Sequence, residues 1–235
     1  MPLISFFTKI LNYLPCEISH IIALQSLKTL HKLGLIRYLV AFDDQIQEGL
    51  SSESNKDIKN YKNKLGIAAG LDKNGDYIDC LASLGIGFIE VGTVTPRPQI
   101  GNPKPRIFRN RKNKSLLNRL GFNNYGVEYL VEKLKERKSS IPVGVSIGKN
   151  FDTPNSHAHL DYLICLEKVY KFSDYIAVNI SSPNTENLRE LSGKEYLNDL
   201  LLKIKNKQDY LASMYGYKNI FKKVSPDEDL DSLKN

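Results

Sequence analysis

Residues 65–93 read LGIAAGLDKNGDYIDCLASLGIGFIEVGT, and this stretch holds one complete strand–helix–strand unit. Leu65–Gly70 is a short apolar run that ends at polar residues, which predicts a strand. Tyr77–Leu84 has a helical pattern and is followed by two glycines. Phe88–Thr93 predicts a second strand. Because strands joined through a helix usually run parallel, the stretch predicts the first unit of a parallel α/β sheet.

The same alternation continues outward to residue 224. Further strands are expected at 143–147, 175–180 and 220–224, and helices at 127–137, 160–172 and 191–214. Short apolar strands alternating with helices predict a parallel sheet that is buried on both faces. Right-handed crossovers then leave either a doubly wound sheet or a (β/α)8 barrel. Both architectures bind ligands at the carboxyl ends of their strands.

Polar segments follow the expected strands. They are Gly70–Gly75, Gly92–Tyr125, Gly148–Asn150 and Asn179–Thr185. All are rich in Asn, Ser, Thr, Lys or Gly. Because the carboxyl ends of parallel strands lie on one face, we expect these segments to form one site.

The segment Ala69–Lys73 is open to two interpretations. It lacks the GxxxxGK[ST] pattern of a phosphate loop. Gly70 would let a flat ligand approach the backbone closely, and Lys73 would supply a positive charge at the strand end. Alternatively, Asp72 caps the following helix and Lys73 is solvated.

The connection from Val94 to Tyr125 is too long for a simple strand–helix loop. It contains eight basic residues and no acidic one: Arg97, Lys104, Arg106, Arg109, Arg111, Lys112, Lys114 and Arg119. Such a charge suits either a nucleic-acid surface or a lid over an anionic small molecule. Only two aromatic residues precede Tyr125 in this connection, and no nucleic-acid-binding motif surrounds them, which favours the lid.

Asn179–Thr185 has the most specific chemistry. Asn side chains donate and accept, so Asn179 and Asn184 can read a ring with alternating C=O and N–H groups. Ser182 is a candidate proton acceptor, although a serine needs a relay or a closed site to act as a base. The segment has no GxSxG pattern and no histidine placed for a triad. An ordinary helix cap is the alternative interpretation.

Composition bounds the class of protein. Hydrophobic residues make up 41% and charged residues 25% of the 235-residue chain, which is typical of a globular protein. The net charge of +7 favours an anionic cofactor, substrate or membrane, or else a solvated surface. Three widely spaced cysteines without a CxxC pattern argue for a reducing compartment and against disulfides or zinc. The pair His157 and His159 lacks further ligands, so no metal site is expected.

Residues 1–40 differ from the rest. Apolar residues recur at helical spacing on both sides of Pro15, Gly34 is a plausible stop, and the polar positions are mainly basic. Two such amphipathic helices can lie in a membrane interface or pack as a hairpin on their own domain. No apolar run reaches the ~18 residues of a spanning helix, and no signal peptide is expected. We expect a polar linker at 41–64 and the barrel at 65–235.

Six strings in order resemble the quinone-dependent (class 2) dihydroorotate dehydrogenases, over about residues 60–227. They are LGIAAGLDKNG, GFIEVGTVTPRPQIGNPKPRIFR, LLNRLGFNNYGV, SIGKNFDTP, DYLICLEKVY and YIAVNISSPNTENLREL. The resemblance implies a (β/α)8 barrel that holds FMN at the strand ends. It also implies oxidation of dihydroorotate to orotate in pyrimidine biosynthesis, with a quinone as final electron acceptor.

The resemblance also assigns residues. The FMN-lining residues would be Ala69, Gly70, Leu71, Asp72, Lys73, Thr93, Ser146, Asn179 and Lys223. The substrate-binding residues would be Lys73, Asn118, Arg119, Leu120, Gly121, Phe122, Asn179 and Asn184. Ser182 would take the proton from carbon 5 while hydride leaves carbon 6 for the flavin, with Phe122 and Thr185 closing and relaying around it. Lys223 would stabilise reduced, anionic flavin. Ser146 departs from the family, which often has Asn there.

Two features favour class 2. Soluble class 1 enzymes generally use a cysteine base and lack the N-terminal helices, whereas this chain has Ser182 and residues 1–40. The resemblance therefore implies peripheral contact of residues 1–40 with the cytoplasmic side of the cell inner membrane, where the quinone enters. No nucleic acid, metal or obligate protein partner is implied.

The number of strands sets a further expectation. We expect five strands where the barrel has eight, and loops after strands seven and eight usually hold the phosphate. The sequence thus predicts a C-terminally truncated enzyme. The alternative is a non-catalytic membrane-surface fragment of that enzyme, unable to hold FMN.

Overall fold

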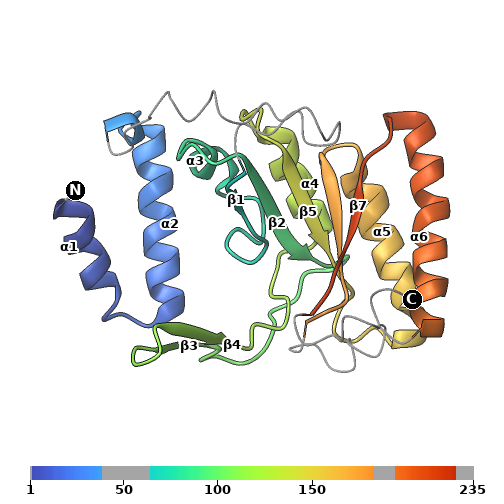
Figure 1. Cartoon of the computed structure of the whole chain (residues 1–235), viewed down its shortest axis with the longest axis horizontal. Coiled ribbons are helices and arrows are strands. Elements are labelled where there is room, and N and C mark those ends of the chain that lie inside the picture. The colour runs from blue at the N-terminus through green and yellow to red at the C-terminus, as the bar shows by residue number, and fades with distance from the viewer. Residues whose placement is uncertain (1, 39–63, 183–193, 226–235) are drawn as a thin grey trace.

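The computed structural model describes residues 2–38, 64–182 and 194–225. Its elements are α1 (Pro2–Leu11), α2 (Cys16–Lys32), η1 (Ile36–Tyr38), β1 (Gly66–Ile67), α3 (Ile78–Ala82), β2 (Phe88–Val94), β3 (Ile107–Asn110), β4 (Ser115–Asn118), α4 (Val127–Glu136), β5 (Val143–Ile147), η4 (Asn155–His157), α5 (Ala158–Tyr170), β6 (Tyr175–Asn179), α6 (Lys194–Tyr215) and β7 (Ile220–Lys223). Figure 1 shows the main sheet in the centre of the molecule, between α2 on one flank and α6 on the other.

The order of the strands decides between the two predicted architectures. The main sheet has the order β1-β2-β5-β6-β7, and every neighbouring pair is parallel. A doubly wound sheet reverses its order at a switch point. In the five strands that the structure describes, the order simply follows the chain. Right-handed crossovers then place every connecting helix on the same face, as in the wall of a (β/α)8 barrel.

One face of this wall is the hydrophobic core. Residues in register across parallel strands point the same way, and side chains alternate between faces along each strand. The row that contains Val91, Val145 and Ile176 is fully buried. It forms one cluster with buried residues of α4 and α5, including Leu130 and Leu166. The β-branched residues of the strands thus pack against the helices, which explains the continuous apolar runs of the sequence.

The opposite row faces the barrel interior. The ring of Phe88 covers Gly66, and the ring of Tyr175 covers Gly144, at the amino ends of the strands. Higher up, the Lys223 ammonium lies 3.1 Å from the Glu90 carboxylate. Their strands β7 and β2 are three strand spacings apart, about 14 Å in a flat sheet. A direct ion pair between them shows that the wall curls toward this face, as a barrel does.

The long basic connection contains a hairpin that the sequence did not predict. Strands β3 and β4 pair antiparallel, from Ile107 opposite Asn118 to Asn110 opposite Ser115. Most of their side chains are exposed. Their sequences also lack the alternation of apolar and polar residues that marks a half-buried strand. The hairpin projects away from the main sheet and lies close to the lower end of α2 (Figure 1).

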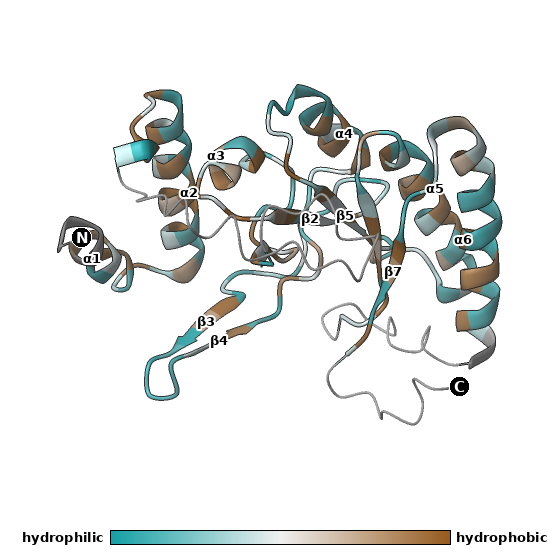
Figure 2. Ribbon diagram, turned by 45° about the horizontal axis from the view of Figure 1, so that its top comes forward, coloured by the Kyte–Doolittle hydropathy of each residue, from teal (hydrophilic) through white to brown (hydrophobic). Residues whose placement is uncertain are grey.

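The two N-terminal helices form where the sequence predicts them, with a break at Pro15 and an end near Gly34, which has φ +69°. Leu24 of α2 joins the core, and Leu27 and Leu30 pack against it. Other large apolar side chains of this region are exposed: Phe6, Phe7, Ile10, Tyr13, Ile18, Ile21 and Ile22. Among the helices that the structure describes, none is long and apolar enough to cross a membrane. Figure 2 shows α1 at the edge of the molecule, beside α2 and apart from the main sheet.

Candidate functional site

A buried polar layer lies at the carboxyl ends of β2, β5 and β6. The Thr93 and Ser146 hydroxyl oxygens are 2.9 Å apart, and the Asn179 amide donates to the Thr93 hydroxyl at 2.8 Å. All three side chains are buried. Two hydroxyl groups share one hydrogen bond here, so one hydroxyl hydrogen remains available for another acceptor. The layer is a floor of donors and acceptors at the mouth of the barrel.

The chain after β1 bends over the end of β2. The backbone N–H of Gly70 donates to the Gly92 carbonyl at 2.9 Å, and the N–H of Gly92 donates to the Asp72 carbonyl at 3.1 Å. This bend shortens the predicted strand 65–70 to Gly66–Ile67. Gly70 has φ +111°, and no atom lies within 4 Å of the position that a Cβ would take. A planar ligand can therefore approach the backbone of Gly70 without steric obstruction.

Asp72 and Lys73 face different environments. The buried Asp72 carboxylate accepts hydrogen bonds from the backbone N–H groups of Asp76 and Tyr77, at 3.0 and 2.8 Å. Burial raises the pKa of Asp72 to about 6. Asp72 thus stabilises the turn that leads into α3. Burial and the nearby positive charge of Arg106 lower the pKa of Lys73 to about 8, while Glu17 acts in the opposite direction.

The end of the basic connection reaches the polar layer. Phe122 is buried and has φ +50°, a left-handed conformation that is uncommon for an aromatic residue. A Cβ added to Gly148 would lie 2.8 Å from Thr93 Cγ2 and 3.1 Å from Phe122 Cε2. Gly148 therefore allows Phe122 to pack against the floor of the site.

Two asparagines of the expected polar segments, to which the sequence assigned no individual role, hold this connection in place. The two N–H hydrogens of the Asn150 side chain are shared among Thr95 Oγ1, the Arg97 carbonyl and Gln99 Oε1, and the side-chain oxygen accepts the Arg97 N–H. The Asn124 amide donates to Thr95 Oγ1 at 2.8 Å and to the Phe122 carbonyl at 2.7 Å. Both residues lie in segments that the sequence placed at the site, Asn150 three residues after a predicted strand and Asn124 near the end of the long connection. Nothing in the sequence indicated their hydrogen bonds.

The hairpin residues predicted to bind substrate make contacts within their own segment. The Arg119 guanidinium donates to the Pro105 carbonyl at 3.0 Å and lies over the Phe108 ring. The Leu120 carbonyl accepts the Asn102 N–H. Asn118 ends β4, whereas Gly121 leads into Phe122 at the strand ends.

The sequence also did not predict a long-range ion pair. Glu17 of α2 accepts from the Arg106 guanidinium at 2.6 Å, and Arg106 is only 6% exposed. Arg106 also donates to the carbonyls of Ile100 and Asn102. The pair joins the N-terminal helices to the basic connection and sets the charge around Lys73.

The remaining predicted residues lie around the same mouth. Ser181 donates to the Asn179 side-chain oxygen, and the next residue, Ser182, is half-buried. Ala69 is half-buried and Leu71 is exposed. Lys223, at the end of β7, pairs with Glu90 below the layer. Asn184 and Thr185 lie outside the described residues.

A barrel wall with a buried polar floor at the carboxyl ends of its strands defines a (β/α)-barrel protein with a candidate ligand site at the usual end of the barrel. The family model described as dihydroorotate dehydrogenase matches residues 53–233, and the chain belongs to this family. The resemblance noted in the sequence is thereby confirmed.

Individual relatives agree. The chain is 50% identical over 212 residues to a dihydroorotate dehydrogenase (quinone) of Acinetobacter baylyi, covering 90% of this chain and 61% of that protein. It is 47% identical to one from Neisseria meningitidis, covering 94% of this chain and 64% of the other. A crystal structure of the Eimeria tenella enzyme in complex with ferulenol superposes with a TM-score of 0.74 at 30% identity, over 92% of this chain and 61% of that one. The chain thus spans about three fifths of the length of these relatives.

Proposed function

We propose that the chain carries the flavin- and substrate-binding part of a quinone-dependent dihydroorotate dehydrogenase. This enzyme would oxidise dihydroorotate to orotate in pyrimidine biosynthesis and pass the electrons to a quinone. The observation that carries the proposal is the layer of Thr93, Ser146 and Asn179, which lies beside the open backbone of Gly70. Asn179 ends β6 and is three residues before Ser182.

The residues at the strand ends suit FMN. Gly70 leaves space for a planar ring, and the hydroxyl and amide groups of Thr93, Ser146 and Asn179 supply hydrogen bonds to its edge. Ala69, Leu71 and Asp72 would shape the adjoining backbone. Lys73 and Lys223 would provide positive charge near the ring. When bound, FMN supplies an acceptor for the hydride from the substrate.

The chain's own residues would bind the substrate and move its proton. Asn179, Asn184 and the segment Asn118–Phe122 would hydrogen-bond and enclose the dihydroorotate ring, and the Lys73 ammonium would attract its carboxylate. The Ser182 hydroxyl would take the proton from carbon 5. Phe122 would exclude water from this position, because it already packs on Gly148 at the mouth of the barrel.

Residues 1–40 would bring the protein to the quinone. Their exposed apolar side chains and basic residues suit peripheral contact with an anionic membrane surface, here the cytoplasmic side of the cell inner membrane. The division into 1–40, a linker at 41–64 and the barrel part at 65–235 belongs to the same proposal.

Flavin titration of the 235-residue chain tests the first step. We expect stoichiometric FMN binding, followed by loss of flavin absorbance when dihydroorotate is added without oxygen. Ser182→Ala should slow this bleaching by orders of magnitude with little change in substrate binding, whereas Ser156→Ala, on the exposed η4 turn, should leave it unchanged. FMN that binds but never bleaches would contradict the assigned reaction. Failure to bind FMN would favour the non-catalytic alternative.

A further inference from the structure

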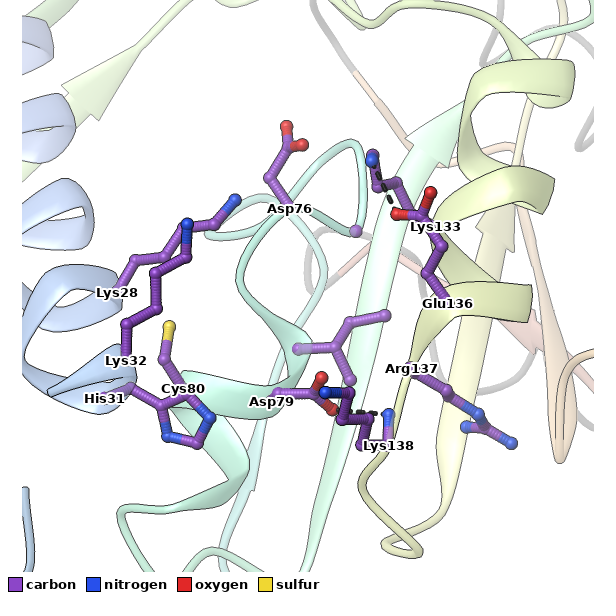
Figure 3. A pocket seen from close by; sticks show the side chains of 12 residues that line it. Lys28, His31, Lys32, Asp76, Asp79, Cys80, Lys133, Glu136, Arg137 and Lys138 are labelled. Carbon is purple, nitrogen blue, oxygen red and sulfur yellow. Dashed lines mark hydrogen bonds and ion pairs between the residues drawn. The ribbon is translucent and has the colours of Figure 1, made fainter. Parts of the chain in front are cut away.

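A second cavity lies on the outside of the barrel wall, between α2, α3 and α4 (Figure 3). Its volume is about 460 Å³. The residues that line it are Lys28, His31, Lys32, Gly75, Asp76, Ile78, Asp79, Cys80, Lys133, Glu136, Arg137 and Lys138. None of the residues proposed for the flavin and substrate site lines this cavity.

The acidic residues of this cavity are already engaged. The Asp79 carboxylate accepts the backbone N–H groups of Lys138 and Ser139, at 3.0 and 2.9 Å. Asp76 accepts the Tyr129 hydroxyl at 2.7 Å. Glu136 pairs with Lys133 at 2.7 Å. Each of these carboxylates therefore has a hydrogen-bond or ion-pair partner other than Lys28, Lys32 and the Lys138 ammonium.

The positive charge of this cavity that is not ion-paired comes from three lysines. Within the described ranges, the ammonium groups of Lys28, Lys32 and Lys138 form no ion pair with a carboxylate. Lys28 lies 5.3 Å from the centre of the Tyr77 ring. Figure 3 shows Lys28 and Lys32 extending from α2 into the space, across from Lys133. The lining as a whole thus holds five cationic side chains against three carboxylates, an excess of two positive charges around one concave space.

We propose that this cavity binds a small anion that carries two or more phosphate charges. Phosphate oxygens accept hydrogen bonds from several ammonium groups at once, and the His31 ring can add another donor. A ligand with a single carboxylate would balance only one of the two excess positive charges of the lining. The volume is in the range of small-molecule sites, about 300–1,000 Å³, and fits a pyrophosphate or a nucleotide.

Binding there would fasten α2 to the barrel. Lys28 and Lys32 belong to α2, whereas Lys133 and Lys138 lie in or just after α4. An anion between them would offset the repulsion of the two groups. The amino end of the same helix carries Glu17, which pairs with Arg106 beside Lys73. The proposed ligand would therefore stabilise the docking of a helix that reaches the other site, and the inference stands independently of the proposed reaction.

Calorimetric titration of the 235-residue chain with inorganic pyrophosphate, at fixed ionic strength, tests the site. We expect saturable binding at a stoichiometry of one. Lys32→Gln with Lys138→Gln should weaken it by at least about tenfold, because each charge-assisted contact is worth roughly a factor of ten. The arginine pair Lys32→Arg with Lys138→Arg should retain binding. ADP in place of pyrophosphate distinguishes a nucleotide from a free polyphosphate.

The matched control removes the same charge elsewhere. Lys112→Gln with Lys171→Gln changes two exposed lysines outside the cavity and should leave the affinity unchanged. Equal weakening by both double variants would mean general attraction to a basic protein and would overturn the proposal. So would the absence of saturable binding in the folded wild-type chain.

Discussion

At the scale of single residues, Lys73 has a strongly lowered pKa, and it is one of the positively charged residues proposed to bind a ligand. Burial and the charge of Arg106 lower its pKa to about 8 from an ordinary value of 10.5. Its ammonium therefore loses its proton as the pH rises through about 8, and we expect the affinity for an anionic ligand to fall there. Below that pH the buried, charged ammonium costs stability. Between about pH 8 and 10.5 the folded chain binds fewer protons than the unfolded chain, so the free energy of unfolding rises with pH across this range as that cost is relieved.

Carbon-13 NMR of reductively methylated lysines measures this titration. One resonance, absent in Lys73→Arg, should titrate near pH 8, whereas exposed lysines titrate near ~10.4. Glu17→Gln should lower that pKa further, since Glu17 acts to raise it. A Lys73 resonance that titrates with the exposed lysines would contradict the buried placement.

Gly148 is a second residue whose role follows from distances. We expect Gly148→Ala to destabilise the protein by about 1–3 kcal/mol, because the added methyl group overpacks the space beside Thr93 and Phe122. Urea unfolding measures the change. Thr93→Ser removes the Cγ2 that lies 2.8 Å from the added Cβ and keeps the hydroxyl group. The double variant should therefore lose less free energy of unfolding than the two single variants lose together. Losses that simply add would refute the proposed clash.

At the scale of elements, the Glu17–Arg106 pair anchors α2 on the basic connection. Glu17→Gln would leave the Arg106 guanidinium, 6% exposed, without its carboxylate. Loss of a hydrogen-bonded charge partner costs about 1.5–3 kcal/mol. We expect faster hydrogen exchange of the α2 amides, measured by mass spectrometry. Glu132→Gln removes an exposed pair with Lys135 and should leave α2 exchange unchanged. Similar exchange of α2 in both variants would remove this anchoring role.

Elements differ in how far the sequence predicts them. Strand 143–147 was predicted at its observed bounds because a mainly apolar run of strand length lies between Pro142 and Gly148. The hairpin β3–β4 was missed because its strands, IFRN and SLLN, place two apolar residues side by side instead of alternating apolar and polar residues. The lysine–glutamate pair between β7 and β2 and the Glu17–Arg106 pair join residues 133 and 89 positions apart. Such contacts depend on the tertiary fold, so no local pattern indicates them.

The candidate site divides in the same way. Strand–helix alternation predicts that polar segments meet at the carboxyl ends of the strands, and the contacts of Thr93, Ser146 and Asn179 agree with this geometry. The strand–helix alternation does not indicate which groups in those segments face a ligand. Asp72 illustrates the limit, since its carboxylate accepts hydrogen bonds in the turn before α3, whereas the sequence offered a cap of that helix or a cofactor contact. The roles of Ser182 and the other proposed residues stay predictions.

At the scale of the whole molecule, the two N-terminal helices expose apolar side chains on a chain with a net charge of +7. Phe6 and Ile10 are one helical turn apart on the same side of α1, and they are 60% and 46% exposed. Full burial of one such side chain contributes about 1.5–3 kcal/mol. Both the apolar face and the charge should therefore contribute to binding at an anionic membrane surface.

Co-sedimentation with vesicles of phosphatidylglycerol and phosphatidylcholine tests this expectation. We expect the chain to bind, and Phe6→Ser with Ile10→Ser to reduce the bound fraction at least tenfold, because two apolar side chains no longer enter the bilayer. Leu202→Ser on α6, which removes a leucine that is 62% exposed on the opposite flank, should have no effect. Raising the salt concentration should weaken binding only in part, since it screens the charges but leaves the apolar contribution. Binding that disappears in salt and ignores the α1 substitutions would assign the membrane contact to charge alone and exclude α1 from it.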